Sequence, residues 1–232
     1  MSSYLQNATV VLVHGAWADG SCWQNIILPL RQQGLKVTCA PIPLTSLLDD
    51  ITALQRVIER TTGPVVLAGH AYGGAVIAAP DDDRIKSLVY VAALAPDEEE
   101  TVADVFYRAD PHPDAPHLAP DEYGFIWMPE EGFCHAVAHN ASQDQATIMS
   151  AVQRPIALKC IQEKAPKPAW KTRPSWFLLA EEDRMISPET QRFMANRMGA
   201  NVRSHQVDHS PMFTAPDLVV RVILDAARQT LQ

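Results

Sequence analysis

Residues 69–73, GHAYG, have the spacing of a nucleophile elbow, G-x-S-x-G, except that Ala71 stands where the serine is expected. In such an elbow a strand turns sharply into a helix, and the residue at the tip holds a strained backbone that costs about 1–3 kcal/mol. A hydroxyl at the tip could attack a carbonyl carbon, but the methyl group of Ala71 cannot. The motif therefore indicates an acyl-transfer site that lacks its nucleophile.

An acid and a histidine follow the elbow in the chain. Asp183 comes just after the apolar run in PSWFLLAEED, and His209, in VDHSPMF, follows the last expected strand. The order of tip, acid and histidine is one in which hydrolases carry a catalytic triad. Other carboxylates compete with Asp183 for the role of acid: Glu181, Glu182 and Asp97. Asp208 is not expected to pair with His209, because adjacent residues on an extended segment point to opposite sides.

Short apolar runs must position these residues, and they alternate with segments of helical period. Strands are expected at residues 9–14, 36–41, 64–69, 86–94, 174–180 and 201–207. Several are nearly continuous in Val, Leu and Ala, which is typical of strands buried on both faces. The predicted fold class is therefore α/β, a mostly parallel sheet flanked by helices.

Helix boundaries are also visible in the sequence. Ser21 and Gln24 predict a capping box ahead of an apolar stripe that begins at Trp23. A second stripe runs through residues 47–58 and is expected to end by Gly63-Pro64. Ser187, followed by proline, predicts the start of another helix, and residues 218–226 predict the apolar face of the last one.

Residues 97–173 break this rhythm, because they are rich in proline and aromatic residues and less regular. We interpret them as a cap of short helices, inserted over the carboxyl edge of the sheet within one domain of residues 1–232. Apolar side chains of the cap are candidates for a substrate-binding surface: Phe106, Trp127 and Met128, together with Tyr107, Phe133 and Met149.

Taken together, the elbow, the Asp183 and His209 loops and the stretch VLVHGAWADGSCW make the chain resemble the α/β-hydrolases. The stretch is similar to the bacterial and plant branch that includes esterases, methylesterases and hydroxynitrile lyases. The resemblance runs from about residue 9 to residue 228. The lyases carry a lysine directly after their histidine, where this chain has Ser210, so the resemblance favours the esterases.

The resemblance implies a role for each matching position. His209 would be the general base and then the general acid, and Asp183 would orient it. The backbone N–H groups of Ala16 and Tyr72 would form the oxyanion hole, and Trp17 beside it would contact substrate. The substrate would be a small apolar or aromatic carboxylic ester.

Ala71 leaves three explanations open. An ester hydrolase could have lost its serine by engineering or by a recent substitution. The protein could instead use the His209–Asp183 dyad for non-covalent chemistry, as a lyase, decarboxylase or cofactor-free oxygenase. Alternatively, it could be a pseudo-hydrolase that only binds a ligand. The intact base, acid and elbow glycines favour the first explanation.

Composition limits the partners. The 27 acidic and 19 basic residues give a net charge of −8, which disfavours nucleic acid and anionic membrane surfaces. Four scattered cysteines and an amino terminus without a basic, apolar leader predict a cytoplasmic protein with reduced thiols. The expected partner is a small-molecule ester, and the sequence leaves open whether two copies form a homodimer.

No cofactor or metal is expected. His135 and His139 have an i, i+4 spacing that could hold a metal, but no glutamate accompanies them as in H-E-x-x-H. We interpret them as surface histidines of the cap. His14 and His70 are interpreted as residues that pack their loops.

Overall fold

A computed structural model describes residues 5–231 and contains a six-stranded parallel sheet. In the order β2-β1-β3-β4-β7-β8, its strands are β2 (Lys36–Ala40), β1 (Thr9–Val13), β3 (Val65–His70), β4 (Ile85–Val91), β7 (Ser175–Ala180) and β8 (Asn201–His205). Every residue of β1, β3 and β7 is buried, as expected for strands that helices cover on both faces. The predicted α/β class is confirmed.

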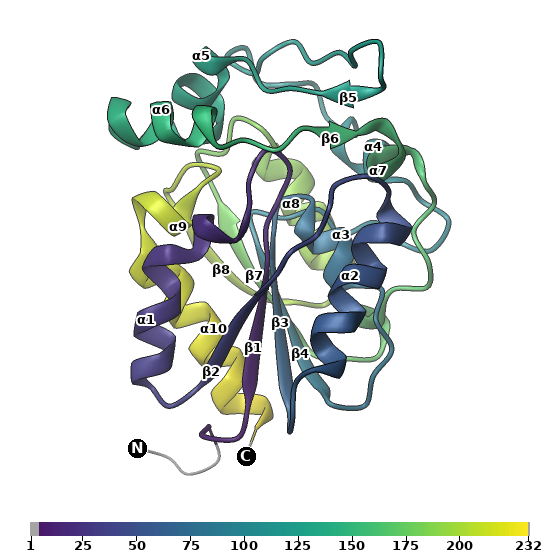
Figure 1. The fold of residues 1–232 in the computed structure, drawn as a ribbon, viewed down its shortest axis with the longest axis vertical. Coiled ribbons are helices and arrows are strands. Elements are labelled where there is room, and N and C mark those ends of the chain that lie inside the picture. Colours follow the sequence, from purple (N-terminus) through teal and green to yellow (C-terminus); the bar gives the residue numbers. More distant parts are fainter. Residues whose placement is uncertain (1–4, 232) are drawn as a thin grey trace.

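Helices on the two faces of the sheet enclose two separate cores (Figure 1). One face carries α1 (Gln24–Gln32) and α10 (Pro216–Thr230), and the other carries α2 (Leu47–Glu59), α3 (Gly73–Ile77) and α8 (Pro188–Arg197). A short helix, α9 (Pro211–Thr214), precedes α10. Within residues 5–231, none of the helices combines the length and apolarity that crossing a membrane requires.

The predicted strands all form, with ends that differ by up to three residues. The Ser187 cap is confirmed, since its side chain accepts a hydrogen bond from the Thr190 amide. The capping box at Ser21 is wrong. Asp19 caps that segment instead, because its carboxylate accepts both the amide and the hydroxyl of Ser21, and residues Gly20–Trp23 form a 3-10 turn, η1, before α1 begins.

The segment between β4 and β7 crosses the carboxyl edge of the sheet (Figure 1). Its elements are α4 (Val102–Phe106), β5 (Phe125–Ile126), α5 (Glu130–Gly132), the π-helical turn η2 (Phe133–Val137), α6 (Gln143–Ala151), β6 (Ile156–Ala157), α7 (Leu158–Gln162) and the 3-10 turn η3 (Ala169–Lys171). The expectation of helices alone missed β5 and β6, which pair antiparallel. A two-residue strand is too short to give a periodic sequence signal.

The elbow between β3 and α3 depends on glycines. A Cβ atom on Gly69 would lie 2.5 Å from the carbonyl oxygen of Gly73, and one on Gly73 would lie 2.7 Å from the carbonyl oxygens of Val13 and His14. Real Cβ atoms essentially never approach backbone atoms that closely, so the strand and helix could not pack this way with larger residues. This close approach places residue 71 at the carboxyl edge, below the cap.

We predict that Gly69→Ala lowers the free energy of unfolding by about 3 kcal/mol or more, because the new methyl group displaces backbone rather than a flexible side chain. Gly124→Ala is the matched control. Gly124 has a φ of +80° but nothing within 4 Å of the added Cβ, so only backbone strain of about 1–2 kcal/mol is expected. Urea unfolding of both variants measures the difference, and equal losses would contradict the steric account.

Candidate active site

Ala71 occupies the tip of the elbow, directly after β3. Its φ of +48° lies in the left-handed region, which residues other than glycine seldom adopt. The Ala71 carbonyl accepts hydrogen bonds from the amides of Gly74 and Leu94, which hold the turn in place. The structure thus retains the strained backbone of a nucleophile elbow around a methyl group.

His209 and Asp183 meet beside this tip. Their atoms Nδ1 and Oδ2 are 2.7 Å apart, and both residues are buried. Asp183 follows β7, whereas His209 lies in the loop after β8, so adjacent parallel strands bring the two together. Because Asp183 engages Nδ1, Nε2 is the nitrogen of His209 that is left for proton transfer.

Asp183 is held from several directions. Its Oδ1 accepts the amides of Met185 and Ile186 at 2.8 and 2.9 Å. Its Oδ2 accepts the Gln191 side-chain amide at 2.8 Å as well as His209. These contacts fix the orientation of the Asp183 carboxylate towards the imidazole, as an orienting residue requires.

The other carboxylates have different partners. Glu181 contacts Arg192 and Ser204, Asp97 contacts Lys171, and Glu182 accepts from Asn140. Asp208 is fully buried but turned away from the imidazole of His209, as its position next to His209 predicts. It accepts hydrogen bonds from the Asn140 and Ser210 amides and from the Thr214 hydroxyl. Asp183 is therefore the carboxylate that the fold brings to His209.

His70 contributes more than loop packing. Its Nε2 donates to the carbonyl of His209 at 2.7 Å, and the two rings lie 4.8 Å apart. Burial, reinforced by His209, lowers the pKa of His70 well below its usual value, so its imidazole is neutral. His14 is also buried and packs against the Gly15 carbonyl, and burial lowers its pKa too.

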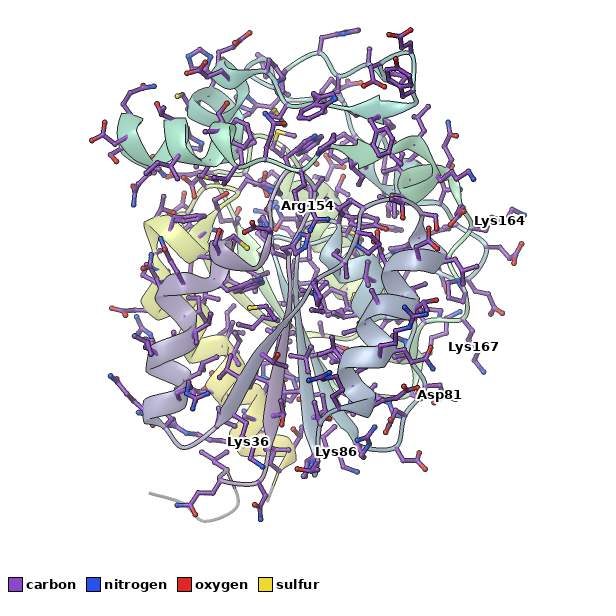
Figure 2. All side chains as sticks on the ribbon, in the orientation of Figure 1. Lys36, Asp81, Lys86, Arg154, Lys164 and Lys167 are labelled. Atoms are coloured by element: carbon purple, nitrogen blue, oxygen red, sulfur yellow. The ribbon has the colours of Figure 1, made fainter. Side chains whose placement is uncertain are left out.

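A cavity of about 80 Å³ lies over Ala71 and His209, enclosed by the elbow, the loop after β1 and the cap. None of its lining residues is charged. Apolar side chains dominate, among them Leu94, Val102, Phe106, Leu118, Ile126 and Phe133. The charged side chains Lys36 and Lys86 lie at the end of the sheet opposite the cap (Figure 2). The cavity therefore suits an uncharged, apolar group.

Ala16 and Tyr72 both line this cavity. Within residues 5–231, neither backbone N–H donates to a backbone carbonyl or to a side chain. One unused amide donor directly after the elbow tip and a second in the loop after β1 are the arrangement that an oxyanion hole requires. Beside Ala16, Trp17 has a φ of +57°, and its indole N–H donates to the carbonyl of Ile126 in β5, which joins this loop to the cap.

The residues predicted to contact substrate divide into those that line the cavity and those that do not. Trp17 and Phe106 line the cavity, as do Tyr107, Phe133 and Met149. Trp127 and Met128 do not reach it. Trp127 is half exposed and its indole donates to Asp121 on the surface, whereas Met128 is buried inside the cap against Gly132. Residue type and spacing alone do not separate side chains packed within the cap from those facing the sheet.

Two residues hold the site together in ways that residue type and spacing did not predict. Gln191 in α8 is fully buried, donates to Asp183 and the Ile186 carbonyl, and accepts the Ala180 amide. Asp208 joins the His209 loop to the cap. A glutamine on a helix has no local signal, and the contact of Asp208 with Asn140 depends on how the cap packs against the His209 loop.

Within residues 5–231 no group of three or more His, Cys, Asp or Glu side chains is arranged to bind a metal. His135 lies in η2 and His139 in the following turn, so the two do not share one regular helix face. All four cysteines are free thiols.

Comparison with known proteins identifies the family of this chain. The family model described as the alpha/beta hydrolase family matches residues 10–222, and the chain belongs to this family. Methylesterase 2 of Arabidopsis thaliana is 25% identical over 251 residues, covering 94% of this chain and 95% of the relative. The resemblance to the esterase and methylesterase branch is confirmed.

Solved structures agree on the fold. Polyneuridine aldehyde esterase has a TM-score of 0.82 at 20% identity, covering 96% of this chain and 100% of that chain. Tomato methylketone synthase I, complexed with 2-tridecanone, has a TM-score of 0.82 at 18% identity, covering 97% and 99%.

We predict that Gln191→Glu lowers the free energy of unfolding at pH 8 by about 3 kcal/mol, because it places a second buried carboxylate beside Asp183 and removes a donor. The two carboxyls would share a proton as the pH falls, so the loss should shrink towards pH 5. Gln145→Glu is the control, since either residue serves in the capping box of α6, and a change below about 0.5 kcal/mol is expected. A pH-independent loss would contradict this.

Proposed function

We propose that the site is that of a carboxylic ester hydrolase for small apolar or aromatic esters, and that Ala71 leaves it unable to form an acyl-enzyme. The observation that carries the proposal is the buried His209–Asp183 pair beside an elbow tip that faces an apolar cavity. Relatives named as methylesterases support ester hydrolysis as the reaction class. The apolar lining supports an apolar acyl or alkyl group as the part bound under the cap.

The mechanism follows for a chain with a serine at the tip. Nε2 of His209 would take the hydroxyl proton while the oxygen attacks the ester carbonyl, and Asp183 would stabilise the imidazolium. The N–H groups of Ala16 and Tyr72 would hold the developing oxyanion. His209 would then protonate the departing alkoxide. Water, deprotonated by the same nitrogen, would release the acid from the acyl-enzyme.

With Ala71 the first bond cannot form. Loss of the nucleophile from a working triad lowers turnover by about 10⁶-fold, which corresponds to roughly 8 kcal/mol of activation free energy. Ala71 is the elbow-tip residue among those that line the cavity, and its methyl group cannot act as a nucleophile. The chain as it stands is therefore expected to bind esters without turning them over.

We predict that Ala71→Ser increases hydrolysis of p-nitrophenyl butyrate at least about a thousandfold over the unmodified chain. The gain should disappear in the double variants that add His209→Ala or Asp183→Asn. Intact mass spectrometry after mixing with substrate should show a butyryl adduct on the single variant. A folded Ala71→Ser variant with no gain in hydrolysis rate would contradict the esterase proposal.

A second candidate is decarboxylation of a β-keto acid by the unmodified chain. Two features favour it: the cavity has no charged lining residue, and methylketone synthase I shares the fold with a ketone bound. A carboxylate desolvated in such a cavity would lose CO₂ more readily, because its charge disperses as the C–C bond breaks. The electron pair would move to the keto oxygen as an enolate held by the N–H groups of Ala16 and Tyr72, and the α-carbon would then take a proton from water, relayed by Nε2 of His209, to give the ketone.

We predict that, if this candidate holds, the unmodified chain accelerates CO₂ release from 3-oxooctanoate, and His209→Ala removes the acceleration. Headspace CO₂ and 2-heptanone, measured by gas chromatography, report the reaction against the spontaneous rate. Equal rates with and without protein would eliminate this candidate and leave the esterase proposal unaffected.

A further inference from the structure

Besides Asp183 and Asp208, a third buried carboxylate contacts the elbow. Asp50, in the first turn of α2, is fully buried, although its helix faces solvent along its other side. Neither His209 nor Asp183 contacts it, and it does not line the cavity. The ester hydrolysis described above does not use Asp50, so the burial of its charge calls for a separate explanation.

Asp50 joins three segments that meet at the elbow. Its Oδ2 accepts the Tyr72 hydroxyl at 2.6 Å and lies 3.6 Å from the Cys160 thiol in α7 of the cap. Its Oδ1 accepts the Leu44 amide at 2.7 Å. Leu44, in the loop between β2 and α2, has a φ of +61° and accepts the Ala157 amide from the cap. One carboxylate thus ties the elbow and the α2 loop to the cap.

Burying the Asp50 carboxylate lowers the stability of the fold, so a contribution to stability does not explain its position. Burial raises the pKa of Asp50 to about 6, even though the Tyr72, Leu44 and Cys160 hydrogen bonds act to lower it. No Lys or Arg is paired with Asp50 among the described residues. An acidic group whose pKa is raised on folding lowers stability above its unfolded pKa, so the ionised form weakens the fold near neutral pH.

We infer that Asp50 is a positioning residue that fixes the backbone N–H of Tyr72 for the oxyanion hole by holding the Tyr72 side chain. The inference rests on the proposed function for its catalytic consequence. Tyr72 is buried, and its ring and its free N–H share one Cα, with φ and ψ of −53° and −34°. Fixing the hydroxyl with a short hydrogen bond to a carboxylate therefore limits rotation of the residue that follows the tip.

The same contacts make the position of Tyr72 sensitive to pH. The titratable groups that face Asp50 are Tyr72 from the elbow, Cys160 from α7 and Asp49 from its own helix. Burial raises the pKa of Cys160 to about 12 and that of Tyr72 well above its usual value, so both remain neutral donors near neutral pH. Ionised Asp50 accepts from all of its donors, whereas protonated Asp50 must give up part of this network below about pH 6.

The kinetic test uses the Ala71→Ser background with p-nitrophenyl butyrate. Asp50→Asn and Tyr72→Phe should each lower kcat by about 10- to 100-fold and leave KM within about twofold, because the oxyanion interaction strengthens in the transition state. Asp49→Asn is the matched control: it removes the neighbouring carboxylate, which bonds Thr45 at the surface, and should leave kcat unchanged. The acid limb of the kcat profile should lose one ionisation in Asp50→Asn and keep it in Asp49→Asn.

A second readout needs no activity and uses the unmodified chain. In ¹H–¹⁵N spectra, the Tyr72 amide should shift with a midpoint near pH 6, and this transition should vanish in Asp50→Asn but persist in Asp49→Asn. If Ala71→Ser is inactive while this titration is seen, the proposed function fails and the structural link stands.

The inference is overturned if the Tyr72 amide does not respond to Asp50, or if Asp50→Asn and Asp49→Asn have equal kcat. A fall in thermal stability with kcat and its pH profile unchanged would also overturn it, because a purely structural role predicts that result. Should Asp50→Asn fail to fold, Tyr72→Phe and the titration of the unmodified chain still decide the question.

Discussion

The close approach of β3 and α3 is the constraint on which the rest of the site depends. Gly69 permits this approach because it has no Cβ, and Gly73 likewise lets α3 lie against the end of β1; the tip residue between them has a φ of +48°. Ala71, Tyr72 and His209 all line the cavity at this turn, and among the described residues the Tyr72 amide has no hydrogen-bond acceptor. A methyl group in this position keeps the geometry of the elbow and removes its chemistry.

Buried carboxylates organise the surroundings of the elbow. Asp183 holds the imidazole, Asp208 joins the histidine loop to the cap, and Asp50 joins Tyr72 to the cap. All three accept backbone amides, which offset part of the cost of removing charge from water. The cavity between them has no charged lining residue, so these charges act on the site through the groups they orient.

Much of the fold could be predicted because its signals are local. Continuous apolar runs mark β1, β3 and β7, and the Ser187-Pro188 pair marks the start of α8. The cap was harder, since β5 and β6 are two residues long and are stabilised by pairing across 30 residues of chain. The capping box predicted at Ser21 does not form, because the Ser21 amide and hydroxyl both donate to the Asp19 carboxylate, which caps η1 ahead of α1.

For the site, the sequence by itself determined the elbow, the absence of a nucleophile at Ala71, and the chain order in which Asp183 and His209 follow. These are fixed by residue type and spacing along one chain. Only the tertiary structure decided that Asp183 rather than its neighbours meets His209, that Trp127 and Met128 lie away from the cavity, and that Asp50 reaches Tyr72. Each of these depends on where side chains from distant segments point, and that direction is set by packing between elements, which a single sequence does not encode locally.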